Sequence, residues 1–168
     1  MADSMPSPSM PSRRAPTSAA RPSTRTSGAA KGILEESLRA PSLLLARVAT
    51  GPFEPPVLLV QLAHFQQQRT LARQFAEGSL RKAWVRCLAK LVEPGLSSLC
   101  VRAAAQPGLS TSLIAVMVAE LQIGMLLQWL GSRESAKPLA FAEAFVAATQ
   151  AAIVAMLRCD ATVFRSLP

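Results

Sequence analysis

The sequence predicts an all-α protein in which helices form a bundle around one core. Half of its residues are apolar, and along most of the chain they recur at intervals of three and four, the period of an amphipathic helix. Tyrosine is absent while alanine and leucine are frequent, a composition that favours helix over sheet. A length of 168 residues supplies one sizeable core but scarcely two.

Residues 1–32 differ from the rest of the chain in composition. They are rich in serine, proline, alanine and arginine and show no apolar periodicity, so we expect a disordered tail. Five basic residues against one aspartate give this tail half of the net charge of +8. No apolar stretch follows the basic residues, so a secretory signal is not expected. An organellar transit peptide fits the arginine and serine content, but five prolines oppose its amphipathic helix.

Residues 33–55 are expected to form a connector of short helices. Apolar residues lie at helical spacing before Pro41, and this proline can begin a second short helix through Leu45 and Val48. Gly51 and Pro52 then break the chain. The main helical domain is therefore expected over residues 56–160, followed by a C-terminal tail over residues 161–168.

Within the main domain, residues 56–77 are predicted to form one helix that ends at Gly78. Its buried stripe contains Leu58, Leu62, Phe65, Ala72 and Phe75. Ser79 suits the N-cap position of the following helix, which has an apolar face of its own. Pro94 and Gly95 are expected to kink or end that second helix, and residues 107–108 to break the chain again.

The second helix carries a basic stripe opposite its apolar face, formed by Lys82, Arg86 and Lys90 at i, i+4 and i+8. Such a stripe can bind phosphates, and the sequence pI of 10.7 favours acidic partners in general. It has no interleaved aromatic residues for stacking on bases. A solvated helix face is the commoner reason for such a pattern, and a basic balance also serves solubility.

Two strongly apolar helices are predicted over residues 110–131 and 138–158. The first approaches the ~20 apolar residues that a bilayer span needs. It contains Glu120, Gln122 and Gln128, and a carboxylate at mid-depth would cost at least ~2.5 kcal/mol. We therefore expect a buried helix of a soluble protein, with no membrane partner.

Each of these helices is apolar on more than one face and must pack against other helices. In the first, Glu120, Gly124 and Gln128 share a stripe; in the second, five alanines do, namely Ala140, Ala144, Ala148, Ala151 and Ala155. Small residues let another helix approach closely, so we expect a four-helix interface between two copies of the chain. Alternatively, the alanine stripe packs only within the monomer.

The sequence contains no recognisable catalytic or metal-binding set, so we expect neither enzymatic activity nor a cofactor. His64 is the one histidine and has no carboxylate three or four residues away. Cys87, Cys100 and Cys159 are too scattered for a disulfide framework. We interpret them as small buried hydrophobic residues in a reducing compartment, the cytoplasm.

Five features follow one another between residues 88 and 157: a helix containing Pro94, a break at residues 107–108, a long apolar helix that closes on residues 129–131, a polar hinge with Pro138 and a final alanine-rich helix. In this order they resemble the C-terminal half of TetR-family (tetracycline-repressor-type) transcriptional regulators. With the preceding helices, the resemblance covers roughly residues 56–158. It implies a region that binds a small effector between its helices and forms a homodimer through its last two long helices.

The DNA-binding part of that family is an N-terminal helix-turn-helix, and here the sequence departs from the pattern. One stretch matches the family's Gly-x-x-Lys-Gly-x-Leu at Gly28, Lys31, Gly32 and Leu34, but Glu35 and Leu38 stand where the family has an aromatic pair. The match is either chance or the remnant of a recognition helix. DNA binding is therefore expected only if a helix-turn-helix is present or is supplied by a partner.

Two functions remain open. The first is an effector-sensing, dimerising regulatory domain for a small apolar or aromatic molecule. Because effector cavities are apolar with a few polar anchors, we expect the pocket at His64, Gln67, Gln68, Trp84 and Gln122. The second is a helical protein-interaction module without an effector, which binds acidic partners or nucleic acid through the basic tail and the basic stripe.

Overall fold

The computed structural model describes residues 25–53, 55–76, 78–132 and 137–164. Within these ranges six α-helices and one 3-10 turn make up the fold and no strand occurs, which confirms the predicted all-α class. The helices are α1 (Arg25–Thr50), α2 (Pro55–Gln67), α3 (Arg69–Ala76), α4 (Gly78–Arg102), α5 (Thr111–Gly131) and α6 (Pro138–Leu157), and the 3-10 turn is η1 (Ala161–Phe164).

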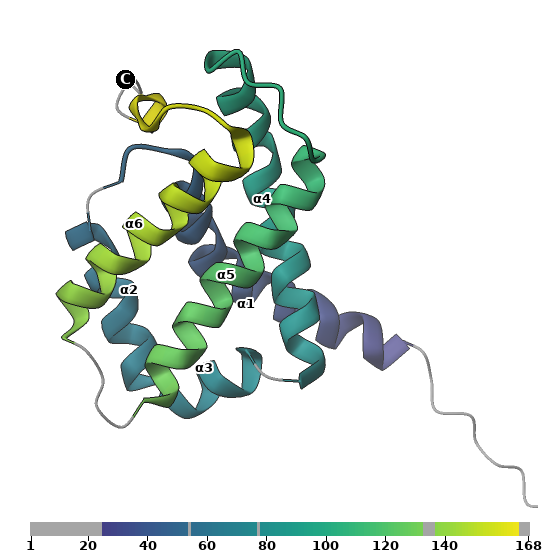
Figure 1. The fold of residues 1–168 in the computed structure, drawn as a ribbon. Coiled ribbons are helices and arrows are strands. Elements are labelled where there is room, and N and C mark those ends of the chain that lie inside the picture. The colour runs from purple at the N-terminus through teal and green to yellow at the C-terminus, as the bar shows by residue number, and fades with distance from the viewer. Residues whose placement is uncertain (1–24, 54, 77, 133–136, 165–168) are drawn as a thin grey trace, which may run out of the picture.

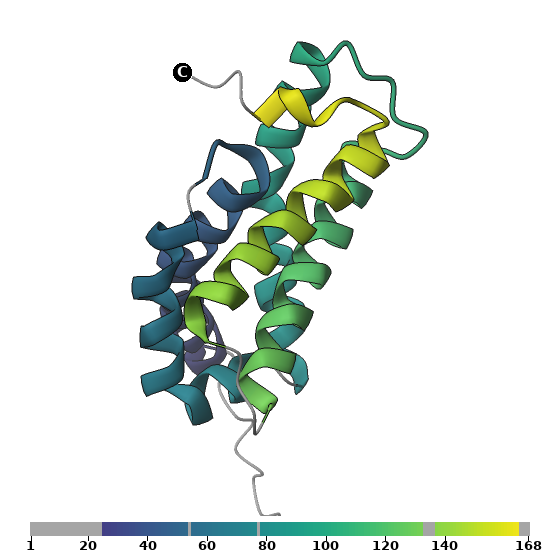
Figure 2. The same ribbon diagram turned by 60° about the vertical axis from the view of Figure 1, so that its left-hand side comes forward.

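The helices surround a single core. Helix α4 packs against α1 and α5, while α6 packs against α5, α2 and α1. Helix α3 contacts α4 and α5 near the end of the bundle where α4 begins (Figure 1). Figure 2 shows α5 and α6 running side by side along the length of the molecule. The core side chains that are fully buried between the helices include Leu45, Leu58, Leu88, Ile123 and Phe145.

Helix α1 corrects two predictions. Residues 25–32, predicted as part of a disordered tail, belong to this helix, and it continues through Pro41 to Thr50 in place of two short helices. A proline inside a helix costs about 3 kcal/mol. Leu38, Leu45 and Val48 are all buried along the continuous helix, and at about 1.5–3 kcal/mol each their burial outweighs that cost. Residues 1–24 of the predicted tail lie outside the described residues.

The helix predicted over residues 56–77 is divided into α2 and α3 at Gln68. The Gln68 N–H still donates to the carbonyl oxygen of His64, and the Ala72 N–H donates to that of Gln68, so the chain passes the junction nearly as one helix. The predicted stripe is preserved: Leu58, Leu62, Phe65 and Ala72 are all buried. The side chain of the fifth member, Phe75, lies outside the described part of the structure.

Helix α4 was expected to kink or end at Pro94, but it runs through this proline to Arg102. It begins at Gly78, one residue before the predicted cap Ser79. A Cβ atom built on Gly95 would lie 2.5 Å from the Cβ of Thr50 in α1. The Pro-Gly pair therefore marks the point where α1 and α4 cross closely, rather than a break between helices.

The two predicted apolar helices match α5 and α6. The Ser110 hydroxyl accepts a hydrogen bond from the Leu113 N–H and so caps the start of α5. At the other end, the guanidinium of Arg69 donates to the carbonyl oxygens of Leu130 and Ser132, which satisfies groups that the end of a helix leaves unpaired. Helix α6 begins at Pro138, as the hinge predicted.

Part of the predicted C-terminal tail packs onto the bundle. Val163 and Phe164 of η1 are buried, because an apolar pair beside the core gains more from burial than the short 3-10 turn costs in ordering. Residues 165–168 lie outside the described residues.

By length and composition, α5 and α6 could each cross a bilayer. In the structure half of the most apolar window of α5 and a third of that of α6 is buried inside the bundle. At mid-length of α5, Gln122 is fully buried, and its Nε2 donates to the Leu45 carbonyl oxygen at 3.1 Å. The apolar composition of α5 is thus accounted for by its position between α4 and α6.

Candidate functional site

A cavity of about 520 Å³ lies where α1, α2 and α4 meet, with one wall completed by α3. Its size falls within the range of cavities that hold small molecules, roughly 300–1,000 Å³. The described residues that line it are Leu38, Ala40 and Pro41 of α1, Val60, Gln61, His64 and Phe65 of α2, Gln68 at the α2–α3 junction, Ala72 of α3 and Trp84 of α4. Side chains from four helices therefore converge on one space.

Two aromatic rings form the apolar side of the cavity. The ring centroids of Phe65 and Trp84 are 6.1 Å apart and the planes are tilted by 56°, an arrangement that aromatic pairs favour. The indole N–H of Trp84 donates to the Ser42 hydroxyl at 3.1 Å in a buried hydrogen bond. This bond satisfies the indole and fixes its orientation. Ala72 also lines the cavity, and its small side chain occupies little of the space.

Three polar side chains line the cavity from α2 and its junction with α3. Gln61, His64 and Gln68 lie at i, i+3 and i+7 and therefore share one face with Phe65. His64 and Gln68 are exposed and Gln61 is half-buried, which places them toward the mouth of the cavity rather than in its depth. The site thus offers apolar contact area within and hydrogen-bonding groups at its entrance.

The structure brings together three of the five predicted pocket residues, namely His64, Gln68 and Trp84. Gln67 does not line the cavity, because consecutive helical residues point about 100° apart and it turns to solvent beside Gln68. Gln122 does not line it either, because its side chain is held in the core by the carbonyl oxygen of Leu45.

The wall supplied by α1 is absent from the sequence prediction. Leu38, Ala40 and Pro41 lie in a segment predicted as a connector, in which the proline is predicted to begin a short helix. The available signal was the helical spacing of the apolar residues on both sides of Pro41, which continues in phase from Leu38 to Leu45.

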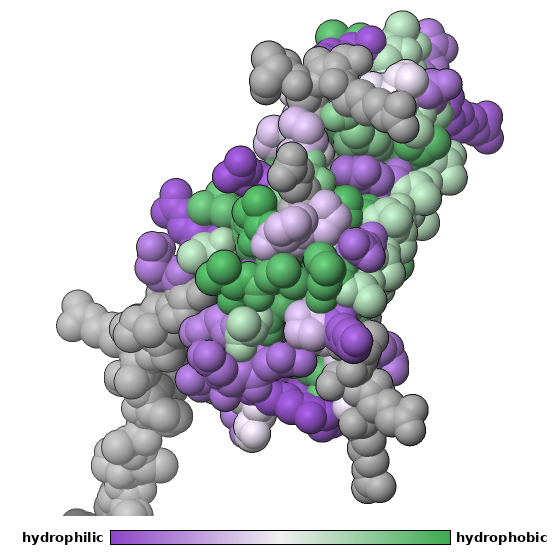
Figure 3. Space-filling view, turned by 90° about the vertical axis from the view of Figure 1, so that its left-hand side faces the viewer, coloured by the Kyte–Doolittle hydropathy of each residue, from purple (hydrophilic) through white to green (hydrophobic). Residues whose placement is uncertain are grey.

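The predicted dimer residues lie on one outer face of the bundle. Of the alanine stripe, Ala148 is half-buried and the other four, Ala140, Ala144, Ala151 and Ala155, are exposed. The stripe is therefore not packed within the monomer, which rules out the alternative drawn from the sequence. Figure 3, which views the side of α2 and α6, shows hydrophobic surface extending over both helices.

Helix α5 adds to this outer face. Glu120, Gly124 and Gln128 line a shallow apolar groove of about 550 Å³, whose floor includes the stacked rings of Trp129 and Phe141, 4.7 Å apart. The carboxylate of Glu120 pairs with the guanidinium of Arg81 in the same chain. Beyond the groove, three large apolar side chains of α5 are 40–46% exposed: Leu113, Val116 and Met117.

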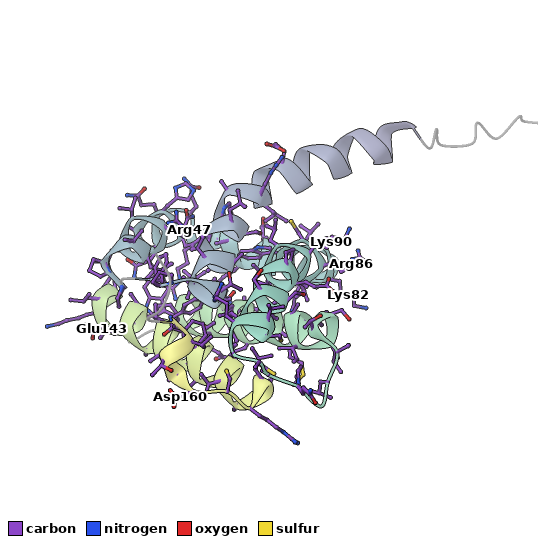
Figure 4. The ribbon with its side chains drawn as sticks, turned by 90° about the horizontal axis from the view of Figure 1, so that it is seen from above. Arg47, Lys82, Arg86, Lys90, Glu143 and Asp160 are labelled. Carbon is purple, nitrogen blue, oxygen red and sulfur yellow. The ribbon has the colours of Figure 1, made fainter. Side chains whose placement is uncertain are left out.

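The basic stripe of α4 faces solvent. Lys82, Arg86 and Lys90 are exposed and extend from the same side of the molecule, away from Arg47, Glu143 and Asp160 (Figure 4). In the described ranges, no three His, Cys, Asp or Glu side chains come together as a metal site requires.

The three cysteines are unpaired thiols and each is half-buried rather than fully buried. Burial raises the pKa of the Cys159 thiol above its ordinary value, and the neighbouring Cys100 and Asp160 raise it further, against a smaller lowering by a backbone hydrogen bond. At neutral pH this thiol is therefore a poorer nucleophile than a free cysteine.

Comparison with protein-family models, with curated proteins and with solved structures finds no match to this chain. The resemblance to TetR-family regulators stays a prediction.

Proposed function

We propose that this protein is an effector-sensing, dimerising regulatory domain that binds a small apolar or aromatic molecule, in the manner of the C-terminal half of TetR-family regulators. The observation that carries the proposal is the cavity between α1, α2 and α4. Its apolar walls and few polar groups are the usual composition of a small-molecule site.

The lining of the cavity favours a particular ligand shape. The ring faces of Phe65 and Trp84 suit a flat or aromatic group, which would gain about 25 cal/mol for each Å² of apolar surface that it buries. Gln61, His64 and Gln68 can donate or accept hydrogen bonds at the mouth. A ligand with an aromatic body and one polar end satisfies both parts.

The outer face of α5 and α6 supports the dimeric part of the proposal. Exposed alanines along α6 and exposed apolar side chains along α5 form a surface that a second copy can cover by close helix packing. Nothing lies within 4 Å of a Cβ built on Gly124, so the monomer leaves room there for a partner helix. Binding of an effector would then favour one arrangement of the two subunits over another.

The regulated step in this proposal is transcription, in the cytoplasm. Sequence-specific DNA contacts would be made by a helix-turn-helix that is present or that a partner supplies.

Ligand binding is tested by intrinsic fluorescence with the dye anilinonaphthalene sulfonate as the first probe and a panel of aromatic acids and amides as competitors. A Trp129→Phe background leaves Trp84 as the only tryptophan, so energy transfer to the dye reports on the cavity wall. We expect saturable binding and a rise in melting temperature with ligand concentration. Ala72→Phe, which fills the cavity, should weaken binding by about tenfold or more, a loss of ~1.4 kcal/mol or more.

The matched control is Val57→Phe, which adds the same ring to an exposed position of α2 outside the cavity. Circular dichroism verifies that both variants fold. If Val57→Phe and Ala72→Phe bind the dye equally, or if no compound raises the melting temperature, the sensor function is refuted.

Dimerisation is tested by sedimentation at micromolar concentration. We expect the wild type to be a dimer and Ala144→Arg/Ala151→Arg to be a folded monomer, because two desolvated charges cannot be buried in a helix interface. Val101→Arg is the control, since its side chain is 82% exposed near the end of α4, which is not one of the two helices of the proposed interface. A wild type that stays monomeric, or a charged double variant that stays dimeric, contradicts the proposed interface.

A further inference from the structure

We propose that the first half of α4 is a phosphate-binding ridge for double-stranded nucleic acid, formed by Lys82, Arg86 and Lys90. This inference concerns a different surface from the effector cavity and does not depend on it. The surface would hold a duplex through its backbone, without reading its sequence.

The three cations form a regular row. They recur every four residues on one helix, so with a rise of 1.5 Å per residue their Cα atoms advance by about 6 Å per step along the axis, and by about 12 Å in total. All three side chains are exposed and extend from the same side of the bundle (Figure 4). A repeating row of positive charge is complementary to a polymer that repeats one negative charge per nucleotide.

The charges of this ridge are free to act on a partner. Within the described part of the chain, none of the three forms an ion pair or a side-chain hydrogen bond. The adjacent Arg81 differs in this respect, because its guanidinium is engaged by the carboxylate of Glu120. The next acidic residue along this face is Glu93, beyond the end of the row and half-buried.

The composition of the ridge favours nucleic acid over a membrane surface. Helices that lie on membranes insert large apolar side chains between the headgroups, whereas the apolar face of α4, which includes Trp84 and Leu88, is buried in the core. Of the exposed large apolar residues in the described ranges, only Val101 lies on α4, at its far end. A row of cations with no apolar anchor beside it suits phosphates that are held in water.

The N-terminal part of α1 lies on the same side of the molecule. The first turns of α1 extend beyond the bundle on the side toward which Lys82, Arg86 and Lys90 project (Figure 4). The sequence of these turns includes Arg25 and Lys31 and no acidic residue before Glu35. In the sequence, the net charge of these turns therefore has the same sign as that of the ridge.

The test is fluorescence anisotropy of the full chain with a labelled DNA duplex of about 20 base pairs and mixed sequence, titrated from about 50 to 200 mM salt. The ridge variant is Lys82→Gln/Arg86→Gln/Lys90→Gln. The control variant, Arg47→Gln/Lys137→Gln/Arg158→Gln, removes the same net charge from exposed positions off the ridge. Circular dichroism confirms that both variants fold.

We expect the slope of log affinity against log salt to fall in magnitude by about 2.7 in the ridge variant, since each neutralised phosphate contributes about 0.9. Taking 1 M salt as the reference at which this electrostatic contribution vanishes, the change corresponds at 0.1 M salt to a loss of affinity of about 500-fold. The control variant should keep most of the slope. An equal loss in both variants would show that only net charge matters and would overturn the ridge.

Two further outcomes also decide the matter. Absence of duplex binding by the wild type at the lowest salt would refute the proposal. Binding to vesicles of phosphatidylcholine and phosphatidylserine that depends on the ridge, without duplex binding, would assign this surface to a membrane and refute it as well.

Discussion

The tight contact between α1 and α4 at Gly95 gives the sharpest prediction about stability. A Cβ atom at Gly95 of α4 would lie 2.5 Å from the Cβ of Thr50 and 2.6 Å from its Cγ2 and Oγ1. Comfortable carbon contacts are about 3.5–4.0 Å, so in Gly95→Ala the helices must separate by about 1 Å. Thr50 cannot easily rotate away, because its hydroxyl donates to the Ala46 carbonyl oxygen at 2.9 Å.

The expected cost of Gly95→Ala follows from two opposing terms. Overpacking in a tight contact costs about 1–3 kcal/mol, and separation of α1 from α4 also disturbs the buried contacts of Val48 and Leu96. Alanine has a helix propensity better than that of glycine by about 1 kcal/mol. We expect a net loss of about 2 kcal/mol in the free energy of unfolding, or a melting temperature lower by roughly 4–8 °C for a chain of this size.

Urea unfolding followed by circular dichroism measures this cost, and a set of backgrounds tests its cause. Thr50→Ala should not rescue Gly95→Ala, because the Cβ at 2.5 Å remains. Thr50→Gly should remove most of the cost. Gly131→Ala, with no atom within 4 Å of its added Cβ, should be nearly neutral. The reasoning fails if Gly95→Ala stabilises the protein or costs as much with glycine at position 50.

Three other predictions concern polar groups. Arg69→Met should lower the free energy of unfolding in urea by about 1 kcal/mol, because the carbonyl oxygens of Leu130 and Ser132 lose the guanidinium as a donor. Arg69→Lys should recover only part of this loss, and full recovery would contradict a contact in which one guanidinium binds two carbonyl oxygens. Thr149→Val should stabilise the protein by about 1 kcal/mol, because the fully buried hydroxyl of Thr149 has no partner in the described structure. Ser42→Ala should destabilise it by about 1–3 kcal/mol, because the Trp84 N–H loses its acceptor. Changes of the same sign and size in the free energy of unfolding of the two variants would contradict this. The pKa of Cys159 is raised, so in a Cys87→Ser/Cys100→Ser background the alkylation rate of its thiol should rise at a higher pH than that of N-acetylcysteine. The contribution of this thiol to the free energy of unfolding should be fully present below the ordinary thiol pKa and should be lost as the pH rises through the raised pKa. An alkylation profile with the same pH dependence as that of N-acetylcysteine would refute this.

The helical class and the buried stripes could be predicted because they depend on local periodicity. Leu58, Leu62 and Phe65 recur on one helical face, and a face of this kind is buried wherever the helix packs. The cap at Ser110 and the start of α6 at Pro138 also depend on local chemistry.

The prolines within helices could not be interpreted from the sequence in the same way. Pro41 and Pro94 remove one backbone hydrogen bond each, a local loss that predicts a break. Whether the helix continues is decided by the core on both sides, which holds Leu38 and Leu45 in α1, and Val92 and Leu96 in α4. Their burial depends on partners distant in the sequence.

The walls of the candidate cavity also differ in whether the sequence could predict them. Its α2 wall, with His64 and Gln68, could be found as polar residues beside an apolar stripe, since both properties belong to one helix. The α1 wall and the exclusion of Gln122 could not, because they depend on how α1 packs against α4 and α6 and on its hydrogen bond to α5.

By itself the sequence determined the all-α class and most of the apolar helix faces, because both depend on the spacing of side chains within one helix. Only the tertiary structure decided that α1 continues through Pro41 and that Thr50 of α1 packs closely against Gly95 of α4. The same is true of the alanines of α6, which face outward, and of Gln122, which faces inward. Each of these depends on the distance between residues far apart in the chain, and packing and hydrogen bonding at those distances set the free energy that selects one arrangement.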